Sequence, residues 1–198
     1  MAHQRTSLLC AAAALVACAI FVGRKRERTP YRVPAGVVVV PATHDEIRLD
    51  GEWEEASWDR TASRHVFVTN GIETRPFSEL RLLHDAKHLY VTVDAADENV
   101  LSSDRFELTI GTLHMAIDPA GHILPEVRGV EVGADLDGTL DHEEDADEEW
   151  VIELAIPLAA IGGSDGDRVP LRAERCDTPR AGGTICGAWS GSIVLDGK

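Results

Sequence analysis

The chain has 198 residues, a length that suits one domain preceded by a short targeting segment. Its formal net charge is −15, and beyond residue 28 there are 14 basic residues against 33 acidic ones. A domain this acidic is repelled by phosphate backbones, so the charge argues against nucleic acid as a partner.

Residues 1–28 predict a signal or lipoprotein leader, or a membrane anchor, that stands apart from the folded domain. Residues 7–23 form an apolar or small-residue stretch that matches the hydrophobic region of an export signal. Within it, Leu15-Val16-Ala17-Cys18 resembles the bacterial lipobox, which makes Cys18 the predicted lipidation site. Basic residues follow at 24–28, and by the positive-inside rule they favour an alternative, an anchor with a cytoplasmic domain. We expect a membrane-tethered, extracytoplasmic protein of the cell envelope, periplasmic or on the surface.

A Pro- and Gly-interrupted linker is predicted at residues 29–36, and the folded domain then occupies residues 37–198. Residues 51–58 predict a turn that leads into one or two helical turns, and residues 158–161 predict another. Apolar residues alternate with polar ones in eight segments, which predicts strands at 65–68, 79–82, 89–94, 105–110, 112–117, 150–156, 169–175 and 188–195. With no long helix, this pattern indicates an all-β fold, an antiparallel β-sandwich.

The folded domain contains two cysteines, Cys176 and Cys186, on either side of a Gly/Pro-rich loop. The economical prediction is a disulfide that closes this loop, and it implies an oxidising compartment. Two buried free thiols are the alternative. Zinc binding is disfavoured because a zinc site needs more ligands than this pair supplies.

One segment carries a family resemblance. Residues 47–58 have the sequence Ile47-Arg48-Leu49-Asp50-Gly51-Glu52-Trp53-Glu54-Glu55-Ala56-Ser57-Trp58. This sequence resembles the opening signature of the family 9 carbohydrate-binding modules. Segments 82–91, 104–108 and 150–158 follow in the order that this family requires. The resemblance implies an antiparallel β-sandwich of immunoglobulin-like or jelly-roll-like architecture. It also implies a non-catalytic module that binds a saccharide.

The same resemblance indicates a sugar site. Glu107 stands where these modules hydrogen-bond the sugar, and His114 takes the place of an arginine on the next strand. Arg172 and Glu174 of the penultimate strand would line the slot. Trp189 would supply an aromatic wall for the apolar face of the sugar ring.

One part of the family's slot is missing from this sequence. A second aromatic residue is expected just before Asp104, but residues 100–103 contain none. Tyr90 or Trp150 would have to replace it from elsewhere in the fold. The alternative function is therefore a structural or protein-interaction sandwich that has lost sugar binding and contacts envelope proteins.

Modules that resemble this one often carry structural Ca²⁺, and one acidic segment offers suitable ligands. Asp135, Asp137 and Asp141 lie around Gly138, and their carboxylates are the hard oxygen donors that calcium prefers. The alternative is a solvated hairpin tip that binds no ion.

Two further functions are disfavoured. A related class of sandwich holds haem through an axial methionine, but Met115 falls among apolar residues of its strand, where core packing is the expected role. The sequence also lacks a Gly-x-Ser-x-Gly elbow, a phosphate-cradling glycine loop and a His-Glu-x-x-His helix. We therefore expect no enzymatic activity.

Overall fold

The computed structural model describes residues 36–59, 61, 65–74, 77–142, 144, 146–162 and 168–196. The predicted leader with Cys18, and the linker up to residue 35, lie outside these residues. Within the described ranges, no helix has the length and hydrophobicity needed to cross a membrane.

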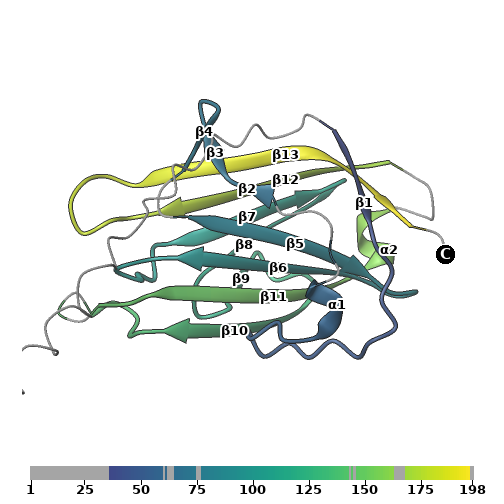
Figure 1. The fold of residues 1–198 in the computed structure, drawn as a ribbon, viewed down its shortest axis with the longest axis horizontal. Coiled ribbons are helices and arrows are strands. Elements are labelled where there is room, and N and C mark those ends of the chain that lie inside the picture. The colour runs from purple at the N-terminus through teal and green to yellow at the C-terminus, as the bar shows by residue number, and fades with distance from the viewer. Residues whose placement is uncertain are drawn as a thin grey trace, which may run out of the picture.

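Two β-sheets form the fold (Figure 1). The larger sheet contains β1 (Val37–Val40), β3 (Val68–Thr69), β4 (Ile72–Glu73), β7 (Arg105–Ile110), β8 (Leu113–Ile117), β9 (Ile123–Leu124), β12 (Val169–Asp177) and β13 (Ile185–Leu195). Its order is β4-β3-β13-β12-β7-β8-β9, with β1 beside β13. The smaller sheet contains β2 (His65–Val66), β5 (Ser78–His84), β6 (His88–Ala96), β10 (Glu131–Asp137) and β11 (Glu149–Pro157), in the order β10-β11-β6-β5-β2. The pairings within both sheets are antiparallel except that of β1 with β13. The chain is thus the predicted all-β antiparallel sandwich.

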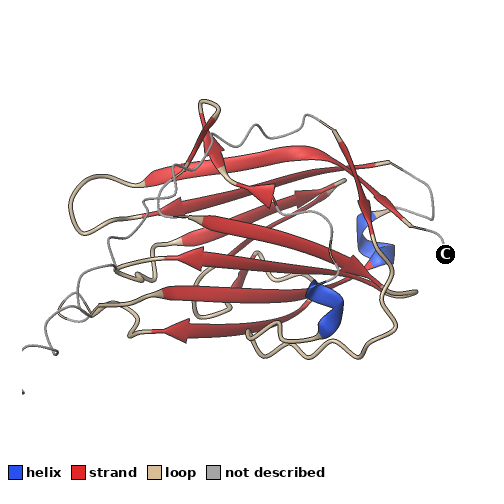
Figure 2. Cartoon of the chain, viewed as in Figure 1, coloured by secondary structure: helices blue, strands red, loops and turns tan. Residues whose placement is uncertain are grey.

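The core lies between the inner faces of the two sheets, and most residues at alternate positions along the long strands are apolar and buried there. Met115 is among these core residues, as the alternation along its strand predicts. Two short helices, α1 (Ala56–Asp59) and α2 (Leu158–Ile161), complete the fold (Figure 2). Both occupy segments predicted as helical turns, and α2 ends at Gly162, which has a φ of 67°.

Several segments differ from the sequence prediction, which contained no strand at β1, β4 or β9. Residues 65–68 do not form one strand, because the chain crosses from β2 of the smaller sheet to β3 of the larger one. Phe67 lies buried at the crossing, edge-on to Phe106 with ring centroids 6.1 Å apart. Residues 131–137, which the prediction left outside any strand, form the edge strand β10.

The segment before α1 covers the outer face of the smaller sheet, where its Leu49 and Trp53 pack with Trp58 of α1 against Leu83 and Tyr90. This packing explains the glycine of the Leu-Asp-Gly motif: Gly51 has a φ of 86°, and a Cβ there would collide with the backbone of Asp135 on β10. Glu153 of β11 fixes the same turn, because its Oε2 accepts the backbone N–H groups of Asp50 at 3.1 Å and Gly51 at 2.9 Å. The Leu-Asp-Gly motif therefore holds the segment before α1 against the outer face of the smaller sheet.

Glu153 is fully buried beneath this segment, and burial raises its pKa to about 7 from the ordinary 4.5. In the unfolded chain the carboxyl loses its proton near pH 4.5, whereas the folded protein keeps it until about pH 7. The folded state then binds more protons between these values, so the free energy of unfolding falls as pH rises from 4.5 to 7. Glu153→Gln keeps an acceptor for both N–H groups and should remove this loss, raising stability relative to wild type by about 1–3 kcal/mol at pH 8 but not at pH 4.5. Urea unfolding of both proteins at pH 4.5 and pH 8 measures this difference in the free energy of unfolding.

The exposed Glu148, just before the same strand, provides the control for Glu153. The free energy of unfolding of Glu148→Gln should differ from that of wild type by the same amount at pH 4.5 and at pH 8. An equal effect of Glu153→Gln at both values would contradict the assignment of the pH dependence to this carboxyl.

Candidate functional site

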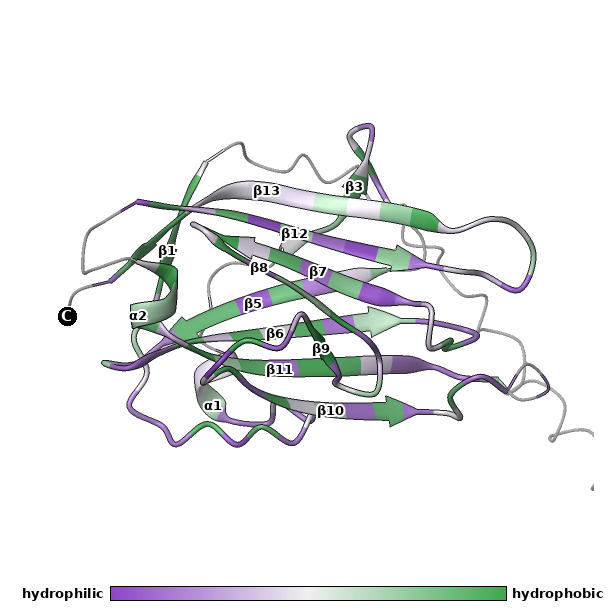
Figure 3. Ribbon diagram, turned by 180° about the vertical axis from the view of Figure 1, so that it is seen from behind, coloured by the Kyte–Doolittle hydropathy of each residue, from purple (hydrophilic) through white to green (hydrophobic). Residues whose placement is uncertain are grey.

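The outer face of the larger sheet carries two rows of side chains across four adjacent strands. Strand register pairs Glu107 with Glu174 at the centre of the first row, with Ala116 on β8 and Ala188 on β13 at its ends. The second row runs His114, Thr109, Arg172 and Ser190. We call these two rows, together with Arg105, the polar face. The alternation that produces it appears in Figure 3 as hydrophilic and hydrophobic residues following one another along β7 and β12.

Ion pairs order the polar face. Arg105 Nε donates to Glu107 Oε1 at 2.6 Å, and Arg172 Nη2 donates to Glu174 Oε2. The two carboxylate side chains are 29% and 24% exposed, so solvent and ligands reach them. Two arginines and two glutamates balance in charge, and the row of the two glutamates ends in the small side chains of Ala116 and Ala188.

A third contact links the second row. Thr109 Oγ1 and His114 Nδ1 lie 3.1 Å apart, and both side chains belong to the outward face of their strands. The structure therefore brings four of the five predicted sugar-binding residues onto one surface: Glu107, His114, Arg172 and Glu174.

Trp189 is the exception, and its predicted role needs correction. It pairs with Ala173 on the inward side of β13 and lies in the core with 1% of its surface exposed. Buried there, its ring offers no face to a sugar. Neither proposed replacement aromatic reaches the polar face either, since Trp150 is buried in the core and Tyr90 packs on the outer face of the other sheet. The two rows themselves contain no Phe, Tyr or Trp.

The three predicted calcium ligands are not brought together. Asp135 and Asp137 are exposed on the edge strand β10, and Asp141 lies beyond the strand with its Oδ1 accepting the backbone N–H of Ser102 at 2.8 Å. They are not among the carboxylates that converge within 4.8 Å of one another in the described residues. The acidic segment begins as a strand rather than as a loop, which separates the side chains along β10. The geometry therefore does not favour a calcium loop here.

The predicted disulfide is present. Cys176 and Cys186 occupy paired positions on β12 and β13, and their sulfur atoms are bonded. The bond ties together the ends of the two strands that contribute Arg172, Glu174 and Ser190 to the polar face, and it closes the loop between them.

Comparison with solved structures matches this architecture. A carbohydrate-binding module of family 9 from Caldicellulosiruptor kristjanssonii, in complex with cellotriose, superimposes with a TM-score of 0.64 at 14% identity, covering 82% of this chain and 94% of the module. The fold is that of the family 9 carbohydrate-binding modules. The family 9 module in complex with glucose, from the same organism, gives a TM-score of 0.62 at 14% identity, over 82% of this chain and 95% of its own.

A third structure has the same fold. A protein from Bacteroides uniformis ATCC 8492, proposed to bind carbohydrate, aligns with a TM-score of 0.58 at 14% identity over 81% of this chain and 99% of its own. No family model matches the sequence, and no curated protein matches it. The likeness to family 9 is therefore one of fold, which neither of the two sequence comparisons detects.

Proposed function

We propose that this protein is a non-catalytic carbohydrate-binding module whose ligand lies on the polar face. The observation that carries the proposal is the pair of rows across β8, β7, β12 and β13, which presents carboxylates, guanidinium groups and hydroxyls on one rigid surface. Proteins with the same fold bind cellotriose and glucose, which supports a saccharide as the ligand.

The chemistry of the polar face favours a neutral saccharide. A sugar hydroxyl both donates and accepts, so it is complementary to a carboxylate beside a guanidinium group. Because Arg105 neutralises Glu107 and Arg172 neutralises Glu174, the surface offers no net charge to attract an ionised sugar. Recognition then rests on hydrogen bonds, with no stacking on Trp189.

Glu107→Gln and Glu174→Gln test the proposal. Each keeps the size of the side chain and removes its charge, so each should weaken saccharide binding by about tenfold or more, since a hydrogen bond to a charged group contributes about 1.5–3 kcal/mol. A glycan-array screen of the full-length chain selects the ligand, with cellotriose and glucose included. Calorimetry then gives the affinities.

Glu131→Gln is the matched control, because Glu131 is an exposed carboxylate on β10 of the other sheet. It should bind the saccharide as wild type does. Full affinity in both Glu107→Gln and Glu174→Gln would place the ligand elsewhere on the molecule.

A second candidate function is favoured by one observation, the lack of any Phe, Tyr or Trp in the two rows. A sandwich without a stacking ring suits a structural or protein-interaction role at the envelope, with the polar face contacting another protein. A folded wild-type chain that binds no glycan on the array would support this function over sugar binding.

We also propose that the protein acts outside the cytoplasm, tethered to the membrane by the predicted leader. The Cys176–Cys186 disulfide supports this location, because such bonds persist in oxidising compartments.

A further inference from the structure

An exposed leucine borders the polar face at the edge of the larger sheet. Leu124 lies on the edge strand β9 and is 67% exposed, one of five large hydrophobic side chains that are exposed among the described residues. Strand register pairs it with Ala116 of β8, whereas the adjoining pair, Ile117 with Ile123, packs into the core. Because paired residues of adjacent strands point to the same side of a sheet, Leu124 extends outward beside Ala116.

Ala116 is a small residue with larger side chains around it. Leu124 of β9 lies on one side of it, and Glu107 of β7 is its partner on the other side. His114 precedes it by two residues on the same outward face of β8. Adjacent strands are about 4.8 Å apart, so the backbones that carry Leu124 and Glu107 are separated by about 10 Å across the alanine. This separation accommodates one pyranose ring.

The side chains around Ala116 offer two kinds of contact. Leu124 and the alanine methyl group are aliphatic, and they suit the C–H groups on one face of a sugar ring. The Glu107 carboxylate, 29% exposed, and the His114 imidazole can hydrogen-bond hydroxyl groups. At the other end of the row, the neighbour of Ala188 is Val68 on β3, which is less exposed than Leu124.

We propose that one pyranose ring of the ligand lies over Ala116, with its C–H face against Leu124 and its hydroxyl groups toward Glu107 and His114. The inference rests on the proposed function, and it adds an apolar contact to the hydrogen bonds of the polar face. An aliphatic side chain thus takes the part that an aromatic ring would play. Leucine offers less contact area than an indole ring, so the contact is weaker than stacking on tryptophan.

Two substitutions of Leu124 test this contact in opposite directions. Leu124→Ser removes the contact and should weaken binding about fivefold or more, because burial of a leucine side chain against a ligand is worth at least this factor. Leu124→Trp enlarges the contact and should strengthen binding about threefold or more. Ile72→Ser is the matched control, since Ile72 is 71% exposed on β4 at the opposite end of the same sheet, and it should bind as wild type does.

A second pair of variants tests the position of the ring. Ala116→Leu fills the space over the alanine and should weaken binding about tenfold or more through steric clash. Ala188→Leu makes the same change at the other end of the row and should alter binding by less than about threefold. Calorimetry of the full-length chain measures every variant, with cellotriose and with the saccharide that binds most tightly on the glycan array.

The outcomes separate this inference from the proposed function. Wild-type affinity in both Leu124→Ser and Leu124→Trp would overturn the apolar contact. Loss of binding in Ala188→Leu but not in Ala116→Leu would overturn the position of the ring. In either case, weakened binding by Glu107→Gln would leave the proposed function standing. A folded wild-type chain that binds no saccharide would instead overturn both.

Discussion

Replacing Arg175 with leucine is expected to lower the free energy of unfolding by about 3–5 kcal/mol, because it leaves the buried carboxylates of Asp97 and Asp177 without a counter-charge. Arg175 is 3% exposed, and besides Asp97 and Asp177 it donates to Ser78 Oγ at 3.1 Å. Its guanidinium group also lies 5.9 Å from the ring of Trp150. Chemical denaturation at pH 7.5, above the raised pKa of Asp177, measures the loss.

Arg172 provides a control on the same strand. It pairs with Glu174 as Arg175 pairs with its aspartates, but its side chain is 50% exposed. Arg172→Leu should therefore change stability by less than about 1 kcal/mol. Equal losses in the two variants would contradict a role for burial. A second variant, Arg175→Leu with Asp177→Asn, should recover part of the loss because it removes one of the unpaired charges.

Trp189→Ala is expected to lower the free energy of unfolding by about 3–5 kcal/mol, the cost of a large cavity in the core. The reason is the position of the ring, which is buried between the sheets on the inward side of β13. Trp189→Phe should cost less, because it keeps most of the buried volume. Urea denaturation monitored by circular dichroism measures both.

Ser190→Ala is the neighbouring control for Trp189, because Ser190 points outward from the same strand and belongs to the polar face. Its effect on stability should lie within about 0.5 kcal/mol. A Trp189→Ala protein that unfolds as wild type does and has lost glycan binding would contradict the core assignment and restore the ring to the ligand site.

Most strands of the fold follow from alternation in the sequence, because a sheet with one buried face imposes a period of two. The exceptions have physical reasons. Phe67 falls between two short strands of different sheets, and the three apolar residues at 66–68 carry no sign of that crossing. Strand β10 contains Asp135 and Asp137 at exposed edge positions, so its composition is that of an acidic loop.

The same period of two explains which site residues could be predicted. Glu107, Arg172 and Glu174 occupy outward positions of β7 and β12, and register places them together. Trp189 shares its inward direction with Ile193 and Leu195, a signal that favours the core over the site.

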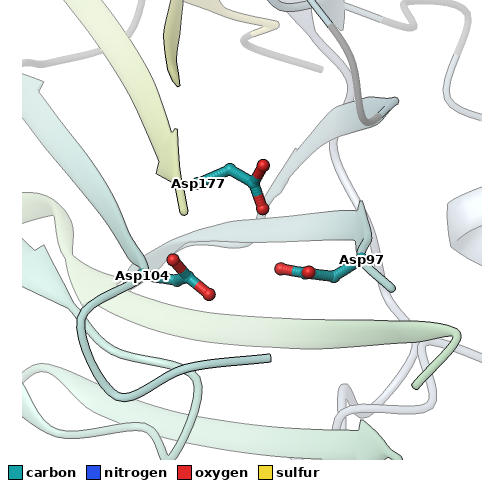
Figure 4. Close-up of side chains that lie close together, drawn as sticks. All are labelled: Asp97, Asp104 and Asp177. Atoms are coloured by element: carbon teal, nitrogen blue, oxygen red, sulfur yellow. The ribbon is translucent and has the colours of Figure 1, made fainter. Parts of the chain in front are cut away.

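Three buried aspartates that converge at one end of the sandwich, Asp97, Asp104 and Asp177 (Figure 4), could not be predicted as a cluster from the sequence. Asp177 is far along the chain from Asp97 and Asp104, and the latter two lie outside the strands. Arg175 was the available clue, since it follows Leu171 and Ala173 on the inward face of β12, where an unpaired charge would be unstable.

The parallel pairing of β1 with β13 has a mechanical consequence. Val37 lies opposite Ser192 and Val40 opposite Leu195, so the first strand of the domain is held along the last one. Consider a force that acts on the chain at residue 36 while a ligand is bound to β12 and β13. This force would act along the strand direction on the backbone hydrogen bonds between β1 and β13. Bonds loaded in this way share the force and fail together, whereas bonds peeled from one end fail one at a time. The domain would thus resist traction at its entry point.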